Sequence, residues 1–438
     1  KAIEIKPDYA EAHLNLGIIF KDLGKLKEAK ILIKKSIKIK PNFSKAYFSL
    51  SLIINPEPKD NLIEYLFSKE IFKNYENLCS IDIADIYYAR GNILEKRKEY
   101  KDSYRMFRIA NIITRKVYKS NFKVYQKLLK QNNLILKKIK ENSKLQINHE
   151  ELPTPIFIAG LPRAGKSTIE SILSNNNLLI KFGDRKGISE AITNYNNIDK
   201  CLQQLGLNIH SKAKEIRDKY ISLAKVNHPD KGGDRETMSE ISIAYKFLIK
   251  EYKGKEKDYI RPSLFKYFID KLGTDLDSKF FTSHTSPNNI LYLGLIISKI
   301  PRSKIIYCYR NHKDHIIELY KYNIKNYLTL RTSTFELAKI IVQIDNIMEE
   351  YKNRYSSQIY FLNFDHLIQE PEIEIRSLLN WLGWVYDDKY LTPRLRQKGV
   401  IKSIHDINNL NSSYINTHIN YIEELKGIEG ILSKSKRY

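Results

Sequence analysis

The stretch "FIAGLPRAGKSTIESIL", residues 157–173, decides the fold class of this chain. It begins with apolar residues that suit a buried strand, passes through a glycine- and proline-containing turn, and ends in a helical pattern. From Gly160 to Ser167 it reads G-x-x-x-x-G-K-S, a spacing that lets backbone N–H groups and a helix start surround an anion. Lys166 adds a positive charge, while Ser167 and Thr168 offer hydroxyl groups. The stretch therefore predicts an α/β domain with an anion-binding loop.

The composition narrows the class of protein further. A chain of 438 residues is long enough for several domains, and none of its apolar runs approaches the ~20 residues of a membrane span. The net charge of +24 comes from lysines spread along the whole chain, so we expect no nucleic-acid partner. Cys79, Cys201 and Cys308 stand far apart with no CxxC pair, which indicates a reducing compartment, here taken as cytoplasmic, and no structural zinc. The chain opens with Lys rather than Met, so we expect it to be a fragment.

The N-terminal third repeats with a fixed period. Pro7 and Pro41 lie 34 positions apart, and "KPDYAEAHLNLGIIFKDLGKLKEAKILIKKSIKI" is followed by "KPNFSKAYFSLSLI". Small and packing residues fall at the positions where a helix-turn-helix unit needs them, at Tyr9, Leu16, Gly17, Gly24 and Ala29, and a weaker unit carries Gly91 and Tyr100. This segment, 1–120, resembles tetratricopeptide (TPR) repeats, whose helix pairs stack because none buries its apolar face alone. The resemblance implies a peptide or protein partner on the repeat face.

A second domain is expected to begin near residue 151. A Lys/Asn-rich segment, 121–150, has apolar positions at helical spacing and is interpreted as a linking helix. Beyond it, "PIFIAGLPRAGKSTIESIL" resembles the 5′-phosphosulfate loop of sulfotransferases that use 3′-phosphoadenosine 5′-phosphosulfate (PAPS). "SPNNILYLGLIISKIPRSKIIYCYRNHKDHIIELYK" and "IYFLNFDHLIQEPEIEIRSLLNWLGW" resemble later segments of that family, in the family's order. The resemblance spans about 151–430, and we expect the domain to run over 151–438. A sulfotransferase-like domain after TPR repeats is the order found in tyrosylprotein sulfotransferases.

The resemblance assigns roles to individual residues. It implies that the 5′-phosphosulfate is held by Arg163, Gly165, Lys166, Ser167 and Thr168, and the 3′-phosphate by Arg310. Lys166 would stabilise the charge that develops on the leaving phosphate, and Asp184, after a glycine, would be the base that removes the acceptor's proton. No metal ion is expected, because the cations are side chains. The acceptor would be a hydroxyl group, of a protein tyrosine or a carbohydrate.

Several positions depart from the family's pattern. His284 and Thr285 replace a usual Asp-Lys pair, and Asn311-His312 follow Arg310 where the family has Asp-Pro. Glu318 replaces a serine that would bond the 3′-phosphate, and a carboxylate there would repel it. The segment 398–403 also differs, and the basic triplet expected after it is absent.

An insertion interrupts the second domain. The segment "CLQQLGLNIHSKAKEIRDKYISLAKVNHPDKGGDRETMSEISIAYKFL", within 197–253, resembles a J-domain of the DnaJ co-chaperone family. A basic amphipathic helix comes before the signature tripeptide and a second helix follows it. The resemblance implies contact with a DnaK-type chaperone through His228, Pro229 and Asp230. A helical hairpin that serves only as a lid or spacer is the alternative.

Three functions therefore remain open from the sequence. The first is a PAPS-dependent sulfotransferase, which the Pro162-Arg163 pair and the downstream segments favour. The second is a P-loop NTPase or kinase that uses Lys166, Ser167 and Asp365. The third is a non-catalytic TPR and J-domain chaperone adaptor on an altered sulfotransferase scaffold. The predicted fold is a helical TPR array followed by an α/β domain with a short parallel sheet between helices, carrying the helical insertion.

Overall fold

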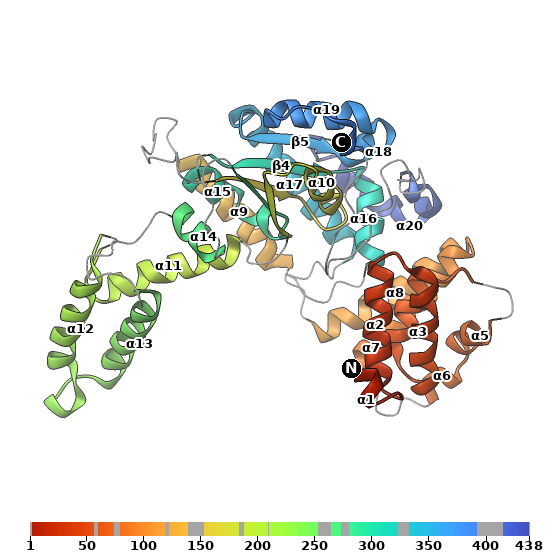
Figure 1. Ribbon diagram of the computed structural model, residues 1–438, viewed down its shortest axis with the longest axis horizontal. Helices are drawn as coiled ribbons and strands as arrows, with labels where there is room; N and C mark the ends of the chain where they lie inside the picture. The colour runs from red at the N-terminus through yellow and green to blue at the C-terminus, as the bar shows by residue number, and fades with distance from the viewer. Residues whose placement is uncertain are drawn as a thin grey trace.

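The computed structural model joins helical repeats, a sheet covered by helices, and a projecting helix pair (Figure 1). It describes residues 2–56, 60–73, 79–118, 122–138, 153–183, 188–208, 210–252, 264–272, 280–300, 302–322, 333–391 and 415–437. The repeat helices and the projecting pair lie on opposite sides of the sheet in this view.

The N-terminal region is built from packed helix pairs. Its helices are α1 (Ala2–Ile5), α2 (Ala10–Asp22), α3 (Leu26–Ile39), α4 (Ser44–Ile53), α5 (Asn61–Phe67), α6 (Glu70–Lys73), α7 (Ser80–Lys96) and α8 (Tyr100–Val117). Within the first pair, a Cβ at Gly17 would lie 2.7 Å from Ile33, and within a later pair a Cβ at Gly91 would meet the ring of Phe107. Gly17 and Gly91 thus lie where two helices touch, whereas Gly24, also predicted to allow close packing, lies in the turn between α2 and α3 with a φ of 72°.

A five-stranded parallel sheet forms the centre of the second region. Its strands are β1 (Thr154–Ala159), β2 (Leu179–Gly183), β3 (Phe281–His284), β4 (Lys304–Tyr309) and β5 (Ile359–Asn363), in the order β2-β3-β1-β4-β5. In register, Phe157 of β1 pairs with His284 of β3 and with Ile305 of β4. All these pairings are parallel, so the carboxyl ends of the strands share one edge. Ligands of open parallel sheets bind at such an edge.

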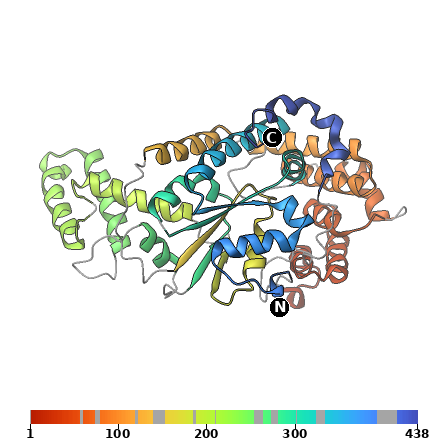
Figure 2. The same cartoon turned by 90° about the horizontal axis from the view of Figure 1, so that it is seen from above.

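Alternate residues of each strand enter two separate cores, as the period of two requires. On one face, Ile156, Ile158 and Ile306 pack with α10 (Lys166–Leu173), α18 (Phe364–Gln369) and α19 (Pro371–Leu382). On the other face, Phe157, Ile305 and Ile359 pack with α9 (Phe122–Lys138), α14 (Leu264–Leu272), α15 (Leu293–Lys299) and α17 (Thr334–Arg354). Figure 2 shows helices on both sides of the twisted sheet. This second core also takes in side chains of the repeats, at Tyr88, Phe107 and Ala110.

The described part of the segment 121–150 forms α9, and residues 121 and 139–150 lie outside it. The segment 197–253, expected to be an insertion, starts inside α11 (Ile188–Gln204) and holds α12 (Ala213–Asn227), a short 3-10 turn η1 (Pro229–Lys231) and α13 (Arg235–Tyr252). Between β3 and β4 lies η2 (Asn289–Leu291), and after β4 comes α16 (His312–Lys321). The chain continues with η3 (Asp388–Tyr390) and ends with η6 (Thr417–Tyr421), α20 (Ile422–Leu425), η7 (Lys426–Ile428) and α21 (Glu429–Leu432).

Candidate functional site

The loop after β1 has the backbone of an anion cradle. Gly160 and Gly165 have φ angles of 136° and 86°, a region that side chains with a Cβ rarely adopt. A Cβ at Gly160 would run into the carbonyl oxygen of Cys308, and one at Gly165 into the ring of Phe364. α10 begins directly after Gly165, so its first N–H groups point toward the loop. Both glycines are therefore required by conformation and by space.

Lys166 fills the centre of this loop. Its side chain is buried, and its Nζ donates hydrogen bonds to the carbonyl oxygens of Gly160 at 2.8 Å and Leu161 at 2.7 Å. Burial lowers the pKa of Lys166 to about 8, because the charged form loses its hydration. An anion in the loop would restore the charged form by pairing with the ammonium group. Of the neighbouring hydroxyl residues, Ser167 is exposed and Thr168 is buried.

Arg310 brings a second buried cation to the same edge. It follows β4, the strand next to β1, and is 2 % exposed. Its guanidinium lies 5.7 Å from the ring centre of Phe364, and its Nε lies 3.6 Å from Asp365 Oδ1. Asp365, the candidate magnesium ligand of an NTPase, thus lies beside a cation and also accepts a hydrogen bond from the N–H of Asn311. Burial raises the pKa of Asp365, and these two partners oppose that shift.

Glu318, which was expected to repel the 3′-phosphate, forms an ion pair with Arg163 of the loop. The loop residue Arg163 has a φ of 67°, and its Nη2 lies 3.0 Å from Glu318 Oε2. Glu318 is buried on α16 and lies 2.8 Å from the Nζ of Lys321. Burial alone would raise the pKa of Glu318, but Lys321, Arg163 and Arg310 together hold it at about 2. The carboxylate is therefore ionised and faces the loop through Arg163.

Two further side chains support the loop and carry no recognisable sequence signal. His315 is buried on α16, and its Nε2 donates to the carbonyl oxygen of Pro162 at 2.8 Å. Burial lowers the pKa of His315 to about 3, so its ring is neutral. Arg437 reaches in from the C-terminal segment and donates to the carbonyl oxygen of Arg310 at 3.2 Å. Neither His315 nor Arg437 belongs to a sequence motif that would mark it. Their support of the loop is visible only in the folded structure.

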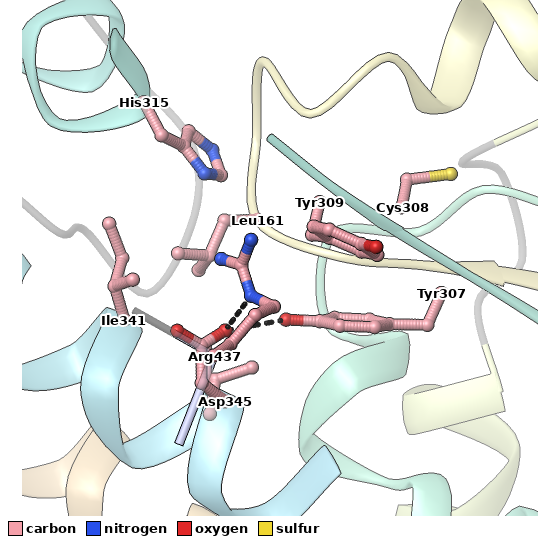
Figure 3. Close-up of a pocket in the computed structure, with 9 residues that line it drawn as sticks. Leu161, Tyr307, Cys308, Tyr309, His315, Ile341, Asp345 and Arg437 are labelled. Carbon is pink, nitrogen blue, oxygen red and sulfur yellow. Dashed lines mark hydrogen bonds and ion pairs between the residues drawn. The ribbon is translucent and has the colours of Figure 1, made fainter. Parts of the chain in front are cut away.

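Figure 3 shows the small cavity under the loop, into which Arg437 projects. Its Nε donates to Asp345 Oδ1 at 2.9 Å, and its guanidinium lies over the ring of Tyr309 at 4.3 Å. Asp345 also lies 2.6 Å from the Nε2 of His312. The lining residues are Leu161, Tyr307, Cys308, Tyr309, His315, Ile341, Ile344, Asp345 and Arg437. The cavity thus lies next to the loop, at Leu161, and is lined in part by Arg437 of the C-terminal segment.

The remaining predicted residues lie elsewhere or outside the described part. Asp184 follows Gly183, the last residue of β2, and lies outside the described residues, as does 398–403. His284 ends β3, where burial lowers its pKa to about 3, and its ring stacks on Phe182 at 5.4 Å. A neutral aromatic ring thus lies where the family has an Asp-Lys pair.

The predicted chaperone-contact residues lie at one end of the α12–α13 pair. His228 caps the end of α12, and its Nδ1 accepts a hydrogen bond from the N–H of Asp230 at 3.3 Å. The side chain of Asp230 is 87 % exposed. The rings of Tyr220 and Tyr245 stack at 3.9 Å and hold the two helices together. His228 and Asp230 are therefore exposed at the turn, Pro229 between them is half-buried, and all three lie apart from the anion loop.

Comparison with known proteins defines the class of this fold and site. A sequence model described as the sulfotransferase family matches residues 155–388, more than half of the chain, and a tetratricopeptide repeat model matches 10–43. The chain belongs to the sulfotransferase family and carries an N-terminal TPR repeat. An uncharacterised protein of Aquifex aeolicus (strain VF5) is 24% identical over 308 residues, which cover 69% of this chain. The match spans 35% of that protein's length.

Solved sulfotransferases were also found. The sulfotransferase domain of the curacin biosynthetic pathway is 13% identical, with 64% of this chain and 98% of that chain covered, at a TM-score of 0.29. The sulfotransferase domain of the Synechococcus PCC 7002 olefin synthase is 13% identical, with 64% and 96% covered, at 0.34. A sulfotransferase of Mycobacterium tuberculosis H37Rv is 10% identical, with 81% and 91% covered, at 0.31. Scores this low add nothing to the family match.

Two absences hold for the residues that the structure describes. Among them, no group of three or more His, Cys, Asp or Glu side chains is arranged to hold a metal ion. Across the same residues, no helix is long and apolar enough to span a membrane.

Proposed function

We propose that this chain transfers a sulfuryl group from PAPS to a hydroxyl acceptor at the carboxyl edge of its sheet. One observation carries the proposal: two buried cations, Lys166 and Arg310, follow the adjacent parallel strands β1 and β4. Two buried cations at one sheet edge suit a ligand with two anionic groups, such as a nucleotide with a 5′-phosphosulfate and a 3′-phosphate. Lys166 with the loop would hold the first group and Arg310 the second. Arg163, Gly165, Ser167 and Thr168 complete the proposed 5′ site.

The proposed transfer is a nucleophilic displacement at the sulfur atom. The acceptor oxygen forms a bond to sulfur, and the bond from sulfur to the bridging oxygen of the 5′-phosphate breaks. The electron pair of that bond stays on the phosphate oxygen, which Lys166 and the N–H groups at the start of α10 stabilise. The acceptor's proton passes to the carboxylate of Asp184, the proposed base. The acceptor is proposed to be a protein tyrosine, as in tyrosylprotein sulfotransferases, or a carbohydrate.

Calorimetric titration with 3′-phosphoadenosine 5′-phosphate, the desulfated donor, tests the nucleotide site. Lys166→Met and Arg310→Met should each weaken its binding about tenfold or more, as expected for a lost bond to a charged group. Lys304→Met is the matched control, because Lys304 begins β4 at the opposite edge of the sheet from Arg310. Binding of ATP with Mg²⁺ but not of the bisphosphate would overturn the proposal and favour the NTPase alternative. Binding of neither would favour a non-catalytic adaptor.

Transfer itself is tested with labelled donor and a tyrosine peptide or an oligosaccharide. Asp184→Asn should abolish labelling of the acceptor while nucleotide affinity is kept. Unchanged turnover in this variant would remove Asp184 from catalysis. The proposed domain limits are 1–120 for the repeats, 121–150 for the linking helix and 151–438 for the transferase domain, with the insertion at 197–253.

We also propose that the insertion is a J-like module, located in the cytoplasm with the rest of the chain, that contacts a DnaK-type chaperone. The exposure of His228 and Asp230 at the turn between α12 and α13 supports this proposal. Stimulation of a DnaK-type ATPase by the full chain should be lost in His228→Gln. His210→Gln, a change at another exposed histidine before α12, should leave the stimulation intact. A chain that gives no stimulation would leave the hairpin as a spacer.

A further inference from the structure

A line of four alternating charges joins the repeat region to the anion loop. Lys321 Nζ lies 2.7 Å from Glu95 Oε1, on α7 of the repeats, and 2.8 Å from Glu318 Oε1. Glu318 Oε2 in turn lies 3.0 Å from Nη2 of Arg163, in the loop. We name these four residues the charge line. Its two ends are 68 positions apart in the sequence, since 163 − 95 = 68, and they meet across α16.

The charges in the middle of this line are strongly held. The side chains of Lys321 and Glu318 are 14% and 9% exposed, so solvent screens them little. Burial alone would lower the pKa of Lys321, yet Glu318 and Glu95 raise it. Glu95 also accepts a hydrogen bond from the hydroxyl group of Tyr421 at 2.9 Å. Any change of charge at Glu95 therefore acts on Lys321, and through it on Glu318.

At the loop end, an incoming anion and Glu318 need the same cation. The Arg163 side chain is 42% exposed and lies over the Tyr322 ring at 5.1 Å, so it can reach either solvent or Glu318. We propose that Glu318 is an internal counter-ion that competes with the bound anion for Arg163, and that Lys321 and Glu95 are positioning residues that set the strength of this competition. The inference rests on the proposed function in one respect, that the loop binds an anion. It makes the repeat region a regulator of donor affinity.

The line predicts opposite signs for its members. Removing the charge of Glu318 frees Arg163 and should raise anion affinity about tenfold, since one unit charge nearby is worth that much at a partly buried site. Removing the charge of Glu95 lets Lys321 pair more fully with Glu318, so affinity should rise by a smaller factor, about threefold. Removing the charge of Lys321 leaves Arg163 as the counter-ion of Glu318 within the charge line. The pair between Glu318 and Arg163 becomes stronger, so the anion affinity should fall about tenfold. General damage to the fold would lower the affinity in all three.

The test is calorimetric titration of the full chain with inorganic pyrophosphate and with 3′-phosphoadenosine 5′-phosphate, at constant pH. Glu318→Gln and Glu95→Gln should bind more tightly than the wild type, Lys321→Met more weakly, and Lys321→Arg as the wild type. The matched control is Glu429→Gln. It breaks an ion pair, at 2.7 Å, with Lys313, which lies on α16 like Glu318 and Lys321 but does not belong to the charge line. Unchanged affinities in all charge-line variants would overturn the proposal. Glu95→Gln, at a partly exposed site, covers the case in which Glu318→Gln does not fold.

Competition is separated from a simple field effect by a double-mutant cycle. In the Arg163→Met background, Glu318→Gln should gain little affinity, because the shared cation is gone. An equal gain with and without Arg163 would overturn the competition. Pyrophosphate affinities that shift as expected while the bisphosphate fails to bind would support this inference and contradict the proposed donor. If the bisphosphate binds but its affinity is the same in all variants, the proposed donor is supported and the competition for Arg163 is contradicted. A chain that binds neither anion would overturn both the proposed donor and the competition.

Discussion

At the scale of single residues, the site is decided by what surrounds each cation. Lys166 is held by two backbone carbonyl groups, which provide partial negative charge but no full counter-ion. Arg163, by contrast, already has a carboxylate partner in Glu318. The two loop cations therefore differ in how readily they accept an anion: Lys166 gains a counter-ion, while Arg163 exchanges one for another.

The first prediction concerns the pH dependence of Lys166. Its pKa of about 8 lies below the ordinary value of 10.5, because the unliganded protein disfavours the buried charge. Below pH 8 the ammonium form is ready to pair, so affinity for inorganic sulfate should be highest there. As pH rises through 8 the lysine loses its proton, and affinity should fall by up to about tenfold per pH unit. Titrations between pH 6 and 10 test this, since sulfate keeps its charge throughout.

The control for this prediction is Lys166→Arg, whose guanidinium stays protonated over the whole range. Its sulfate affinity should be independent of pH, whatever its absolute value. The stability of the unliganded protein should show the opposite trend to binding. Between pH 8 and 10.5 the unfolded chain binds this proton more tightly than the folded chain, so stability should rise with pH. A wild-type affinity that stays flat from pH 7 to 9 would contradict the assignment.

The second prediction separates conformation from space at Gly165. Gly165→Ala forces a Cβ into a left-handed residue and against the ring of Phe364, so we expect a loss of about 2–4 kcal/mol in the free energy of unfolding. Gly383→Ala is the matched control, because its φ is 74° but nothing lies near its added Cβ. It should cost about 1–2 kcal/mol and leave sulfate binding intact. Urea unfolding of both variants measures the difference, and equal costs would show that Phe364 yields.

At the scale of elements, α16 connects more parts of the molecule than its ten residues suggest. It starts beside Arg310, supports the loop through His315, and ends at Lys321, which contacts the repeats. Near its start, the fully buried Asp314 accepts hydrogen bonds from the N–H groups of Asn416 and His418, both at 2.8 Å. The same helix therefore holds the C-terminal segment, which supplies Arg437 to the site.

The third prediction tests this attachment. Asp314→Asn replaces one of the two acceptor oxygens by an NH2 group, which presents N–H donors to one of these backbone N–H groups, so the segment 415–437 should detach locally. Amide hydrogen exchange at Asn416 and His418 should speed up at least about tenfold, which corresponds to one lost bond to a charged group. Asp102→Asn is the control, because Asp102 is exposed and pairs with Arg105 on the same helix. Protection that stays unchanged at 416 and 418 would show that other contacts hold the segment.

The positions of these helices and strands could be predicted from the sequence. The contacts between elements that are distant in the sequence could not. The glycine spacing and strand pattern around Gly165 indicated the loop and the strand before it, and the family order indicated Arg310. The ion pair between Glu318 and the loop could not be predicted, because Arg163 and Glu318 are 155 positions apart, and neither could the link to the repeats, because Glu95 and Lys321 are 226 positions apart. The carboxylate that was predicted to repel the 3′-phosphate instead pairs with Arg163, which only the fold brings near it. A local sequence pattern predicts which face of a helix or strand is buried. Ion pairs between distant segments depend on the topology of the whole chain.

At the scale of the whole molecule, the repeats and the sheet region share one core. Tyr88 and Phe107 of the repeats belong to the same apolar cluster as Phe157 of the sheet. At the same contact, Asn111 donates from Nδ2 to the carbonyl oxygen of Tyr320 at 2.9 Å and accepts a hydrogen bond from the hydroxyl group of Tyr88 at 3.1 Å. The TPR region is therefore a fixed part of the sulfotransferase body, which is what a charge line between them requires.

The fourth prediction follows from this shared core. Asn111→Ala leaves the carbonyl of Tyr320 and the hydroxyl of Tyr88 buried without this partner, so unfolding should require about 1–3 kcal/mol less. Repeats and sheet should still unfold together in one transition, because their apolar contacts remain. Asn92→Ala is the matched control, since Asn92 is also buried but bonds Ser51 inside the repeats at 2.9 Å. Its loss should be similar in size, yet only Asn111→Ala should speed hydrogen exchange at the end of α16. Two separate transitions in either variant would show that the repeats are an independent unit, and that the charge line crosses a weak interface.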